Sequence, residues 1–195
     1  METAKTASHA RSSRTAVRML CEGAIMIALA LVLNQLKLFR LPNGGSITLE
    51  MLPIFFFAIR WGVAPGLLVG FAFGLLQMFI DGAVAWGWQS LLLDYLVAFT
   101  PLGLAGLFRG KSWGVYAGTV LGSFARFVVH FISGVTIYRI LAPTELFGTM
   151  FDNPALYSVV YNGSYMAIDM ALCLVLFGLL HRPLEKYLMG RDIPR

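Results

Sequence analysis

The sequence predicts an all-α integral membrane protein, a bundle of six transmembrane helices in which the second helix is short. Of the 195 residues, 58% are hydrophobic and only 13% are charged, whereas about a quarter of the residues in a soluble domain carry a charge. Apolar runs such as Gly62–Ile80 hold no charged residue over about 19 positions, which is enough to cross a bilayer core. The runs lack the alternating pattern of a lipid-facing strand, so their backbones are expected to be helical.

The first three helices are predicted from the apolar runs in the N-terminal half of the chain. Val17–Leu36 is the first such run. Leu49–Ile59 follows the Gly44-Gly45-Ser46 loop, contains Pro53, and is too short to span a bilayer without tilting. Val63–Ile80 carries glycine at every fourth position, a spacing that lets helices pack closely and does not indicate a phosphate loop. These glycines are Gly62, Gly66, Gly70 and Gly74.

The remaining helices are predicted at Ser90–Phe108, Trp113–Ile140 and Leu156–Leu180. Trp86 and Trp88 precede the fourth helix and are typical of interfacial anchors, although they could also cover a binding site. We expect residues 1–14 to form a disordered cytoplasmic tail, residues 15–188 the membrane domain, and residues 189–195 a second cytoplasmic tail. Cys21 and Cys173 lie in apolar runs far apart, which favours packing over a disulfide.

The basic residues predict the orientation of the bundle. With a cytoplasmic N-terminus, the outer side holds only Lys37, Arg40 and Arg139. The excess of basic residues on the other side follows the positive-inside rule, so we expect both termini in the cytoplasm. The formal charge of +5 therefore needs no nucleic acid partner. The inner residues are Lys5, Arg11, Arg14, Arg18, Arg60, Arg109, Lys111, Arg182, Lys186, Arg191 and Arg195.

Several polar residues lie inside the predicted spans, where a charge costs about 2.5–3.5 kcal/mol and so requires a reason. Asp94 lies about 6 Å below the outer end of the fourth helix and His130 about 15 Å below that of the fifth. Gly134 and Tyr138 follow His130 on roughly the same helical face. The sixth helix begins with Tyr157 and Asn162. Together these residues predict a polar pocket open to the outside, although His130 alone could be an interhelical hydrogen-bond partner and Tyr157 a belt residue.

Arg126 and Asp169 form a separate case. Counted from the outer ends of their helices, they lie at depths of about 21 Å and 20 Å. We therefore predict that they form a buried ion pair with a structural role.

Two motifs for known enzyme chemistry are missing from the sequence. It contains no G-x-x-x-x-G-K-[ST] and no H-E-x-x-H, and no His/Cys cluster has metal-ligand spacing. We therefore expect neither an enzyme nor a cofactor or metal. Ala24 and Ala28 repeat the small-residue spacing on the first helix, where they could serve internal packing or dock another membrane subunit.

Four blocks of the sequence resemble one known family. They are GGSITLEMLPIFFFAIRWG, QSLLLDYLVAF, RFVVHFISG and LYSVVYNGSYM. In order and spacing they are similar to the thiamine-specific substrate-binding subunit of energy-coupling factor transporters, from about Val17 to Leu180. The resemblance implies a bacterial plasma-membrane subunit that captures thiamine from outside. It also implies partners: a transmembrane coupling subunit and two ATPase subunits.

The resemblance also implies roles for individual residues. Asp94, followed by Tyr95, would pair with the thiazolium cation, and His130 would stack on its ring together with Tyr138. Gly134 would leave room for the ligand. The remaining implied substrate-binding residues are Tyr157, Asn162 and Arg126, and the implied docking face for the coupling subunit is Ala24 and Ala28, with Val32 where a third small residue would be expected. Some relatives carry Glu, Trp and Lys where Asp94, Tyr138 and Arg126 stand, and a Trp before the second helix is replaced by the Gly44-Gly45-Ser46 region.

Other readings of the same residues remain. The chain could serve another vitamin, such as riboflavin, or act as a stand-alone carrier, although a carrier usually shows a repeated half that is not evident here. An intramembrane enzyme would use Asp94 and His130 as an acid–base pair. A purely structural membrane subunit would bind no ligand.

Overall fold

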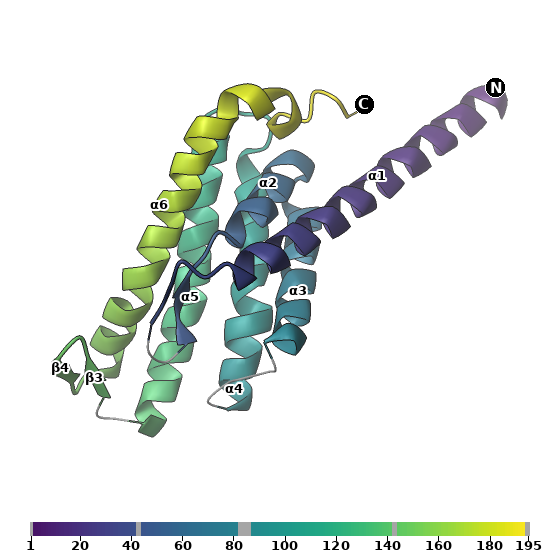
Figure 1. The fold of residues 1–195 in the computed structure, drawn as a ribbon. Coiled ribbons are helices and arrows are strands. Elements are labelled where there is room, and N and C mark those ends of the chain that lie inside the picture. The colour runs from purple at the N-terminus through teal and green to yellow at the C-terminus, as the bar shows by residue number, and fades with distance from the viewer. Residues whose placement is uncertain (1, 42–43, 82–86, 142–143, 194–195) are drawn as a thin grey trace.

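The computed structural model describes residues 2–41, 44–81, 87–141 and 144–193, and side chains within 13–41, 44–81, 87–136 and 145–193. Both chain termini lie at one end of the helical bundle, which we call the terminal end (Figure 1). Two short β-hairpins lie toward the opposite end, which we call the hairpin end. In the described part, five helical segments are long and apolar enough to cross a membrane, which confirms the all-α membrane fold.

The helices agree with the predicted runs, with differences at their ends. Helix α3 spans Val63–Ile80 as predicted, and the short helix α2 spans Met51–Trp61. Helix α1 spans Glu2–Gln35, so its described part begins before the predicted apolar run. Helix α5 spans Gly114–Leu141 and α6 spans Pro154–Leu188.

The fourth predicted helix is the one that departs most from an α-helix. Its span consists of one α-helical turn, α4 (Trp88–Ser90), a π-helix, η2 (Leu91–Val97), and a 3₁₀-helix, η3 (Thr100–Phe108). A π-helical stretch is rare and is frequently found at functional sites. Asp94 lies in the middle of this one.

Helix α2 occupies the centre of the bundle, which explains how so short a helix persists. Its side chains from Ile54 to Trp61 are mostly buried and contact α1, α3, η3, α5 and α6. Pro53 lies in the first turn, where its missing N–H removes no hydrogen bond. The hydrophobic core forms around this helix, with Phe55, Phe73 and Phe99 all fully buried.

Glycines on α3 bring its backbone against η2 and η3, as their spacing predicted. A Cβ atom at Gly70 would collide with the carbonyl group of Phe99, and one at Gly74 with that of Tyr95. Only glycine permits this approach, so the α3 stripe serves internal packing.

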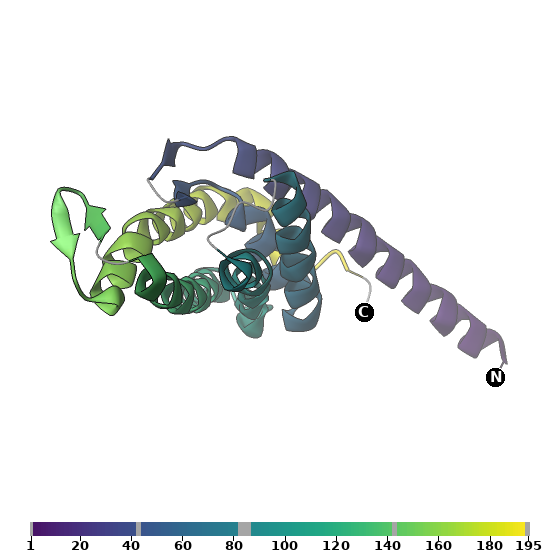
Figure 2. The same cartoon turned by 90° about the horizontal axis from the view of Figure 1, so that it is seen from below.

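Two antiparallel hairpins, which were not predicted, complete the hairpin end. Strands β1 (Phe39–Arg40) and β2 (Ser46–Ile47) pair Phe39 with Ile47. Strands β3 (Thr144–Leu146) and β4 (Thr149–Phe151) connect α5 to α6. Seen from the hairpin end, the β3–β4 hairpin projects beyond α6, while α1 extends away from the other helices toward its N-terminus (Figure 2).

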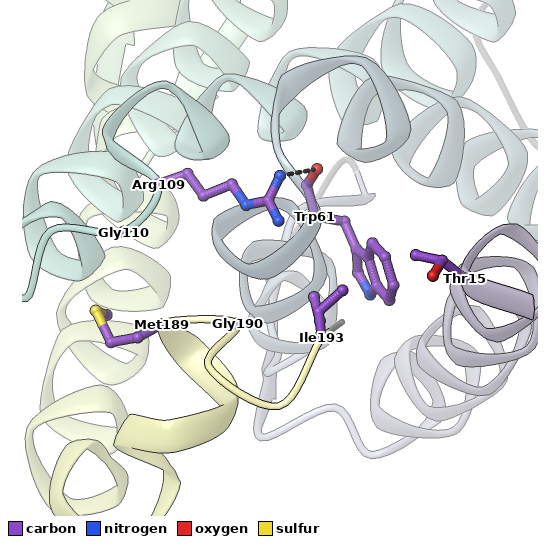
Figure 3. Close-up of a pocket in the computed structure, with 7 residues that line it drawn as sticks. All are labelled: Thr15, Trp61, Arg109, Gly110, Met189, Gly190 and Ile193. Carbon is purple, nitrogen blue, oxygen red and sulfur yellow. Dashed lines mark hydrogen bonds between the residues drawn. The ribbon is translucent and has the colours of Figure 1, made fainter. Parts of the chain in front are cut away.

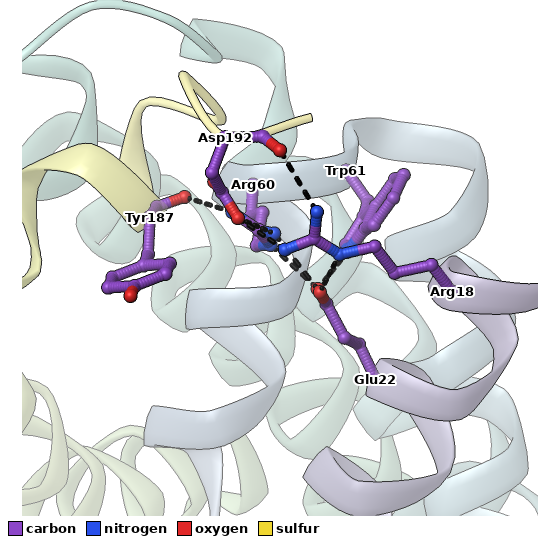
Figure 4. A network of polar contacts seen from close by, with 6 residues as sticks. All are labelled: Arg18, Glu22, Arg60, Trp61, Tyr187 and Asp192. Atoms are coloured by element: carbon purple, nitrogen blue, oxygen red, sulfur yellow. Dashed lines mark hydrogen bonds and ion pairs between the residues drawn. The ribbon is translucent and has the colours of Figure 1, made fainter. Parts of the chain in front are cut away.

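A cluster of charged side chains ties the terminal end together (Figure 4). Arg60, whose side chain is only 2% exposed, contacts Glu22 of α1 at 2.6 Å and Asp192 at 2.7 Å. Arg18 contacts the same two carboxylates. These contacts hold Asp192, in the segment after α6, against α1 and α2. We call Arg18, Glu22, Arg60 and Asp192 the terminal network.

Candidate functional site

The predicted pocket residues with described side chains come from η2, α5 and α6, and α5 packs against both of the other segments. The structure joins Asp94 of η2 to His130 of α5, with 3.1 Å between Oδ1 and Nδ1. The second carboxylate oxygen of Asp94 accepts a hydrogen bond from Ser90 Oγ at 2.6 Å. The Asp94 side chain is still 26% exposed. Because a carboxylate offers about four lone-pair positions, these two bonds leave room for a further partner.

Arg126 determines which nitrogen of His130 carries the proton. Its Nε–H points at His130 Nε2, at a donor–acceptor distance of 3.4 Å. Since Nε2 must then act as an acceptor, the ring proton lies on Nδ1 and is donated to Asp94. The imidazole is therefore neutral in this arrangement. Asp94 keeps its negative charge instead of sharing it with an imidazolium.

The partner of Arg126 is Glu50, which corrects the predicted ion pair with Asp169. Arg126 Nη2 contacts Glu50 Oε1 at 3.0 Å, and both side chains are nearly fully buried. Asp169 instead accepts a hydrogen bond from the backbone N–H of Thr48 at 3.0 Å. The Arg126 guanidinium also lies 4.1 Å from the ring centroid of Phe99, which adds a cation–π contact.

Glu50, Arg126, His130 and Asp94 thus form one continuous chain of polar contacts, which we call the central network. The guanidinium of Arg126 contacts the Glu50 carboxylate directly and is linked to the Asp94 carboxylate through the neutral imidazole of His130. With both carboxylates ionised, the sum is +1 − 2, or one net negative charge. A buried site of this charge attracts a cation, because low local dielectric strengthens the interaction.

Helix α6 contributes the amide predicted for the pocket. Asn162 Nδ2 donates to the backbone carbonyl of His130 and to Ser158, and its carbonyl oxygen accepts a hydrogen bond from Tyr165 at 3.0 Å. Gly134 faces this contact closely, since a Cβ atom there would collide with Ser158 Oγ. The absence of a side chain at Gly134 leaves room for Ser158 and Asn162 of α6 at this level.

A row of tyrosines lines the same part of α6. Tyr157 and Tyr161 are stacked with ring centroids 5.7 Å apart, and Tyr165 packs against Tyr161 and His130 edge to face. Tyr161 OH accepts a hydrogen bond from the backbone N–H of Gly45, in the β1–β2 hairpin, at 2.7 Å. This hydrogen bond holds the β1–β2 hairpin against the row of tyrosines on α6.

Neither Tyr161 nor Tyr165 was predicted from the sequence to belong to the site, and Glu50 was assigned no role. The two tyrosines follow Tyr157 at intervals of four residues, which places all three on one helical face. Ser90 precedes Asp94 by the same interval. This periodicity was the available signal for the aromatic row and for the hydroxyl partner of Asp94.

Other predicted residues stand as follows. Tyr95 is partly buried on η2, directly after Asp94. Trp88 is 69% exposed. Ala24 and Ala28 are both exposed on α1, beside an exposed Val32. The side chain of Tyr138, and Trp86 as a whole, lie outside the described residues. Among the described residues, no group of three His, Cys, Asp or Glu side chains could hold a metal ion.

Comparison with known proteins gives consistent results. Residues 20–189 match the model of the family described as "Thiamine transporter protein". Over 184 residues the chain is 35% identical to the thiamine transporter ThiT of Bacillus subtilis, covering 86% of this chain and 92% of that protein. It is 30% identical over 190 residues to ThiT of Lacticaseibacillus paracasei, covering 88% and 90%.

A solved structure of ThiT from Listeria monocytogenes has a similar fold. Its TM-score is 0.78 at 23% sequence identity, with 88% of this chain and 97% of that chain covered. The match supports the six-helix arrangement described above.

Proposed function

Because the chain belongs to the thiamine transporter protein family, we propose that it is the substrate-capture subunit of an energy-coupling-factor importer. In this proposal it binds thiamine at the hairpin end and delivers it with a transmembrane coupling subunit and two ATPase subunits. The relatives named as thiamine transporters support the substrate. The subunit itself supplies binding and no ATP hydrolysis.

The observation that carries the proposal is the partly exposed carboxylate of Asp94 in the central network, hydrogen-bonded to His130. Thiamine holds a thiazolium, a permanent cation that cannot be neutralised by losing a proton. Its site needs a fixed anion and aromatic surfaces. Asp94 supplies the anion because Arg126 keeps His130 neutral, and His130, Tyr157 and Tyr165 supply rings nearby. Asn162, Tyr95, Gly134 and Tyr138 complete the proposed set of binding residues.

Orientation follows from the charges at the terminal end. Both termini lie there (Figure 1). Arg18 and Arg60 contact Asp192 at this end, and Arg109 contacts the backbone of Trp61. The positive-inside rule places this end in the cytoplasm and the hairpin end outside. Thiamine would then enter from the outer face. The exposed Ala24 and Ala28 on α1 are available to dock the coupling subunit.

The two main alternatives are less consistent with the geometry. Riboflavin has no permanent cation, so it would leave the charge of Asp94 uncompensated. An acid–base enzyme would need a free nitrogen on His130 to exchange protons with its substrate. Both ring nitrogens already have partners, Asp94 and Arg126.

The test is a titration of the purified protein with thiamine, in which binding is measured by the quenching of tryptophan fluorescence. We expect Asp94→Asn to weaken binding at least tenfold, or about 1.4 kcal/mol, because the amide removes the charge and keeps the shape. Asp152→Asn is the matched control, since Asp152 is exposed at the same end of the bundle. Equal affinity of the two variants, or preferential binding of riboflavin by the wild type, would contradict the proposal.

A further inference from the structure

A cavity of about 550 Å³ lies at the terminal end, far from the central network. Residues of four segments line it: Thr15 of α1, Trp61 of α2, Arg109 after η3, and Met189 and Ile193 of the C-terminal segment. The indole of Trp61 lies between Thr15 and Ile193 (Figure 3). The side chain of Arg109 points toward Trp61 from the side opposite Thr15. This volume is within the range of about 300–1,000 Å³ that small-molecule sites occupy.

The charge of Arg109 is uncompensated by the side chains around it. Two other arginines of this end, Arg18 and Arg60, each contact Glu22 and Asp192. Arg109 donates to the backbone carbonyl of Trp61 at 3.2 Å and has no carboxylate partner among the residues that the structure describes. The guanidinium therefore brings a positive charge to the cavity wall. A planar guanidinium binds phosphate oxygens particularly well.

The surroundings of the cavity are those of the membrane boundary. The apolar span of α1 begins at Ser13, two residues before Thr15. Leu107 and Trp113, on either side of Arg109 in sequence, are 57% and 54% exposed, and Val17 is exposed on α1. In a membrane these side chains face acyl chains. A phosphate that reaches Arg109 here can thus remain attached to a lipid whose tails lie along the neighbouring helices.

From these contacts we infer that the cavity binds the phosphate headgroup of an anionic phospholipid, with Arg109 as its cationic contact. Basic pockets between transmembrane helices bind such headgroups in other proteins. The site depends on the position of the terminal end at the membrane surface and not on the identity of the transported solute. Its occupant would bridge α1, α2 and the C-terminal segment.

The experiment uses the full-length protein, delipidated in a non-ionic detergent and titrated with dioleoyl phosphatidylglycerol or dioleoyl phosphatidylcholine. Native mass spectrometry measures retained lipid, and thermal unfolding measures stabilisation. We expect phosphatidylglycerol to be retained and phosphatidylcholine to be retained weakly. Arg109→Gln should reduce retention of phosphatidylglycerol at least fivefold, and Thr15→Phe, which fills the cavity without changing charge, should do the same.

Arg191→Gln is the matched control because Arg191 lies at the same end, is 64% exposed, pairs with Glu185, and is not one of the residues that line the cavity. Its lipid retention should equal that of the wild type. Equal losses in Arg109→Gln and Arg191→Gln would overturn the assignment, as would displacement of the lipid by millimolar inorganic phosphate, which would indicate a site for free phosphate. Thiamine affinity measured in the same variants should be unchanged, so failure of this inference is distinguishable from failure of the proposed function.

Discussion

The terminal network and the central network each join four side chains from segments distant in sequence, but their charges add up differently. In the terminal network, Arg18 and Arg60 face Glu22 and Asp192, so two positive charges meet two negative ones. In the central network, Arg126 faces Glu50 and Asp94 across a neutral His130. The charges of the terminal network therefore cancel within the chain. With both of its carboxylates ionised, the central network lacks one positive charge.

This difference separates a structural role from a binding role. A balanced cluster holds helices together and gains nothing from an additional ion. An unbalanced cluster inside a membrane is unfavourable until a cation arrives, and an intramembrane charge is therefore expected to be functional. Asp94 also remains partly exposed, whereas Arg60 is almost fully buried. On this basis, variants of the terminal network should change stability, and variants of the central network should change thiamine binding.

The largest effect is expected for Arg60→Gln. It leaves Glu22 and Asp192 with only the more exposed Arg18, and breaking a buried ion pair from one side typically costs about 3–5 kcal/mol. Thermal unfolding in detergent should show a large decrease in Tm. Thiamine affinity of the folded fraction should stay at the wild-type value. A loss of affinity as large as that of Asp94→Asn would show that the two networks are not separate.

Arg18→Gln provides the control for this comparison. The Arg18 side chain is 38% exposed, and its contacts with the same two carboxylates are therefore screened by water. Its effect on Tm should be clearly smaller than that of Arg60→Gln. Equal effects would indicate that the burial of Arg60 contributes nothing to the terminal network.

A smaller effect is expected from acid, through Asp192. Hydrogen bonds from Arg60 outweigh desolvation and hold the pKa of the Asp192 carboxyl well below its ordinary value. Because the pKa is lower in the folded state, this contribution to stability is complete above the unfolded-state pKa of about 3.9 and is lost as the pH falls further, through the folded-state pKa. Between pH 8 and 5, the difference in Tm between wild type and Asp192→Asn should be constant.

Below about pH 4 the same difference should shrink, because the wild-type carboxyl becomes protonated as well. The measurement is the Tm of both proteins across the pH series at constant ionic strength. A difference that already declines between pH 7 and 5 would contradict the lowered pKa of Asp192. Addition of sodium chloride at pH 7 should reduce the difference only through the exposed contact of Arg18.

The apolar runs were sufficient to predict the helices, because length and the absence of charge determine a membrane span almost directly. The bounds of α3 were predicted correctly for this reason. The interior of the fourth span was not, since a π-helix and a 3₁₀-helix have the same hydropathy as an α-helix. Counting depth from helix ends nevertheless placed Asp94 and His130 at compatible levels, and the structure brings them together.

The same counting failed for Arg126 and Asp169, because depth does not specify which side of a helix a residue faces. Both lie at similar levels, but Arg126 faces the central helix α2 and contacts Glu50 just before its start. The terminal network was missed for a different reason. Asp192 lies beyond the last apolar run, where hydropathy carries no information about a segment that folds back.

The smallest effect is expected for Asp169→Asn, and it tests where the central network ends. Asp169 accepts a hydrogen bond from the backbone N–H of Thr48, and an amide oxygen can accept the same bond. Thiamine affinity should therefore stay within about twofold of the wild type, or roughly 0.4 kcal/mol. Glu50→Gln is the matched comparison, because it removes the ion-pair partner of Arg126 and should lower Tm. If Asp169→Asn reduced Tm and Glu50→Gln did not, Arg126 would depend on Asp169 after all, and the net charge available to bind a cation would have to be assigned to a different set of residues.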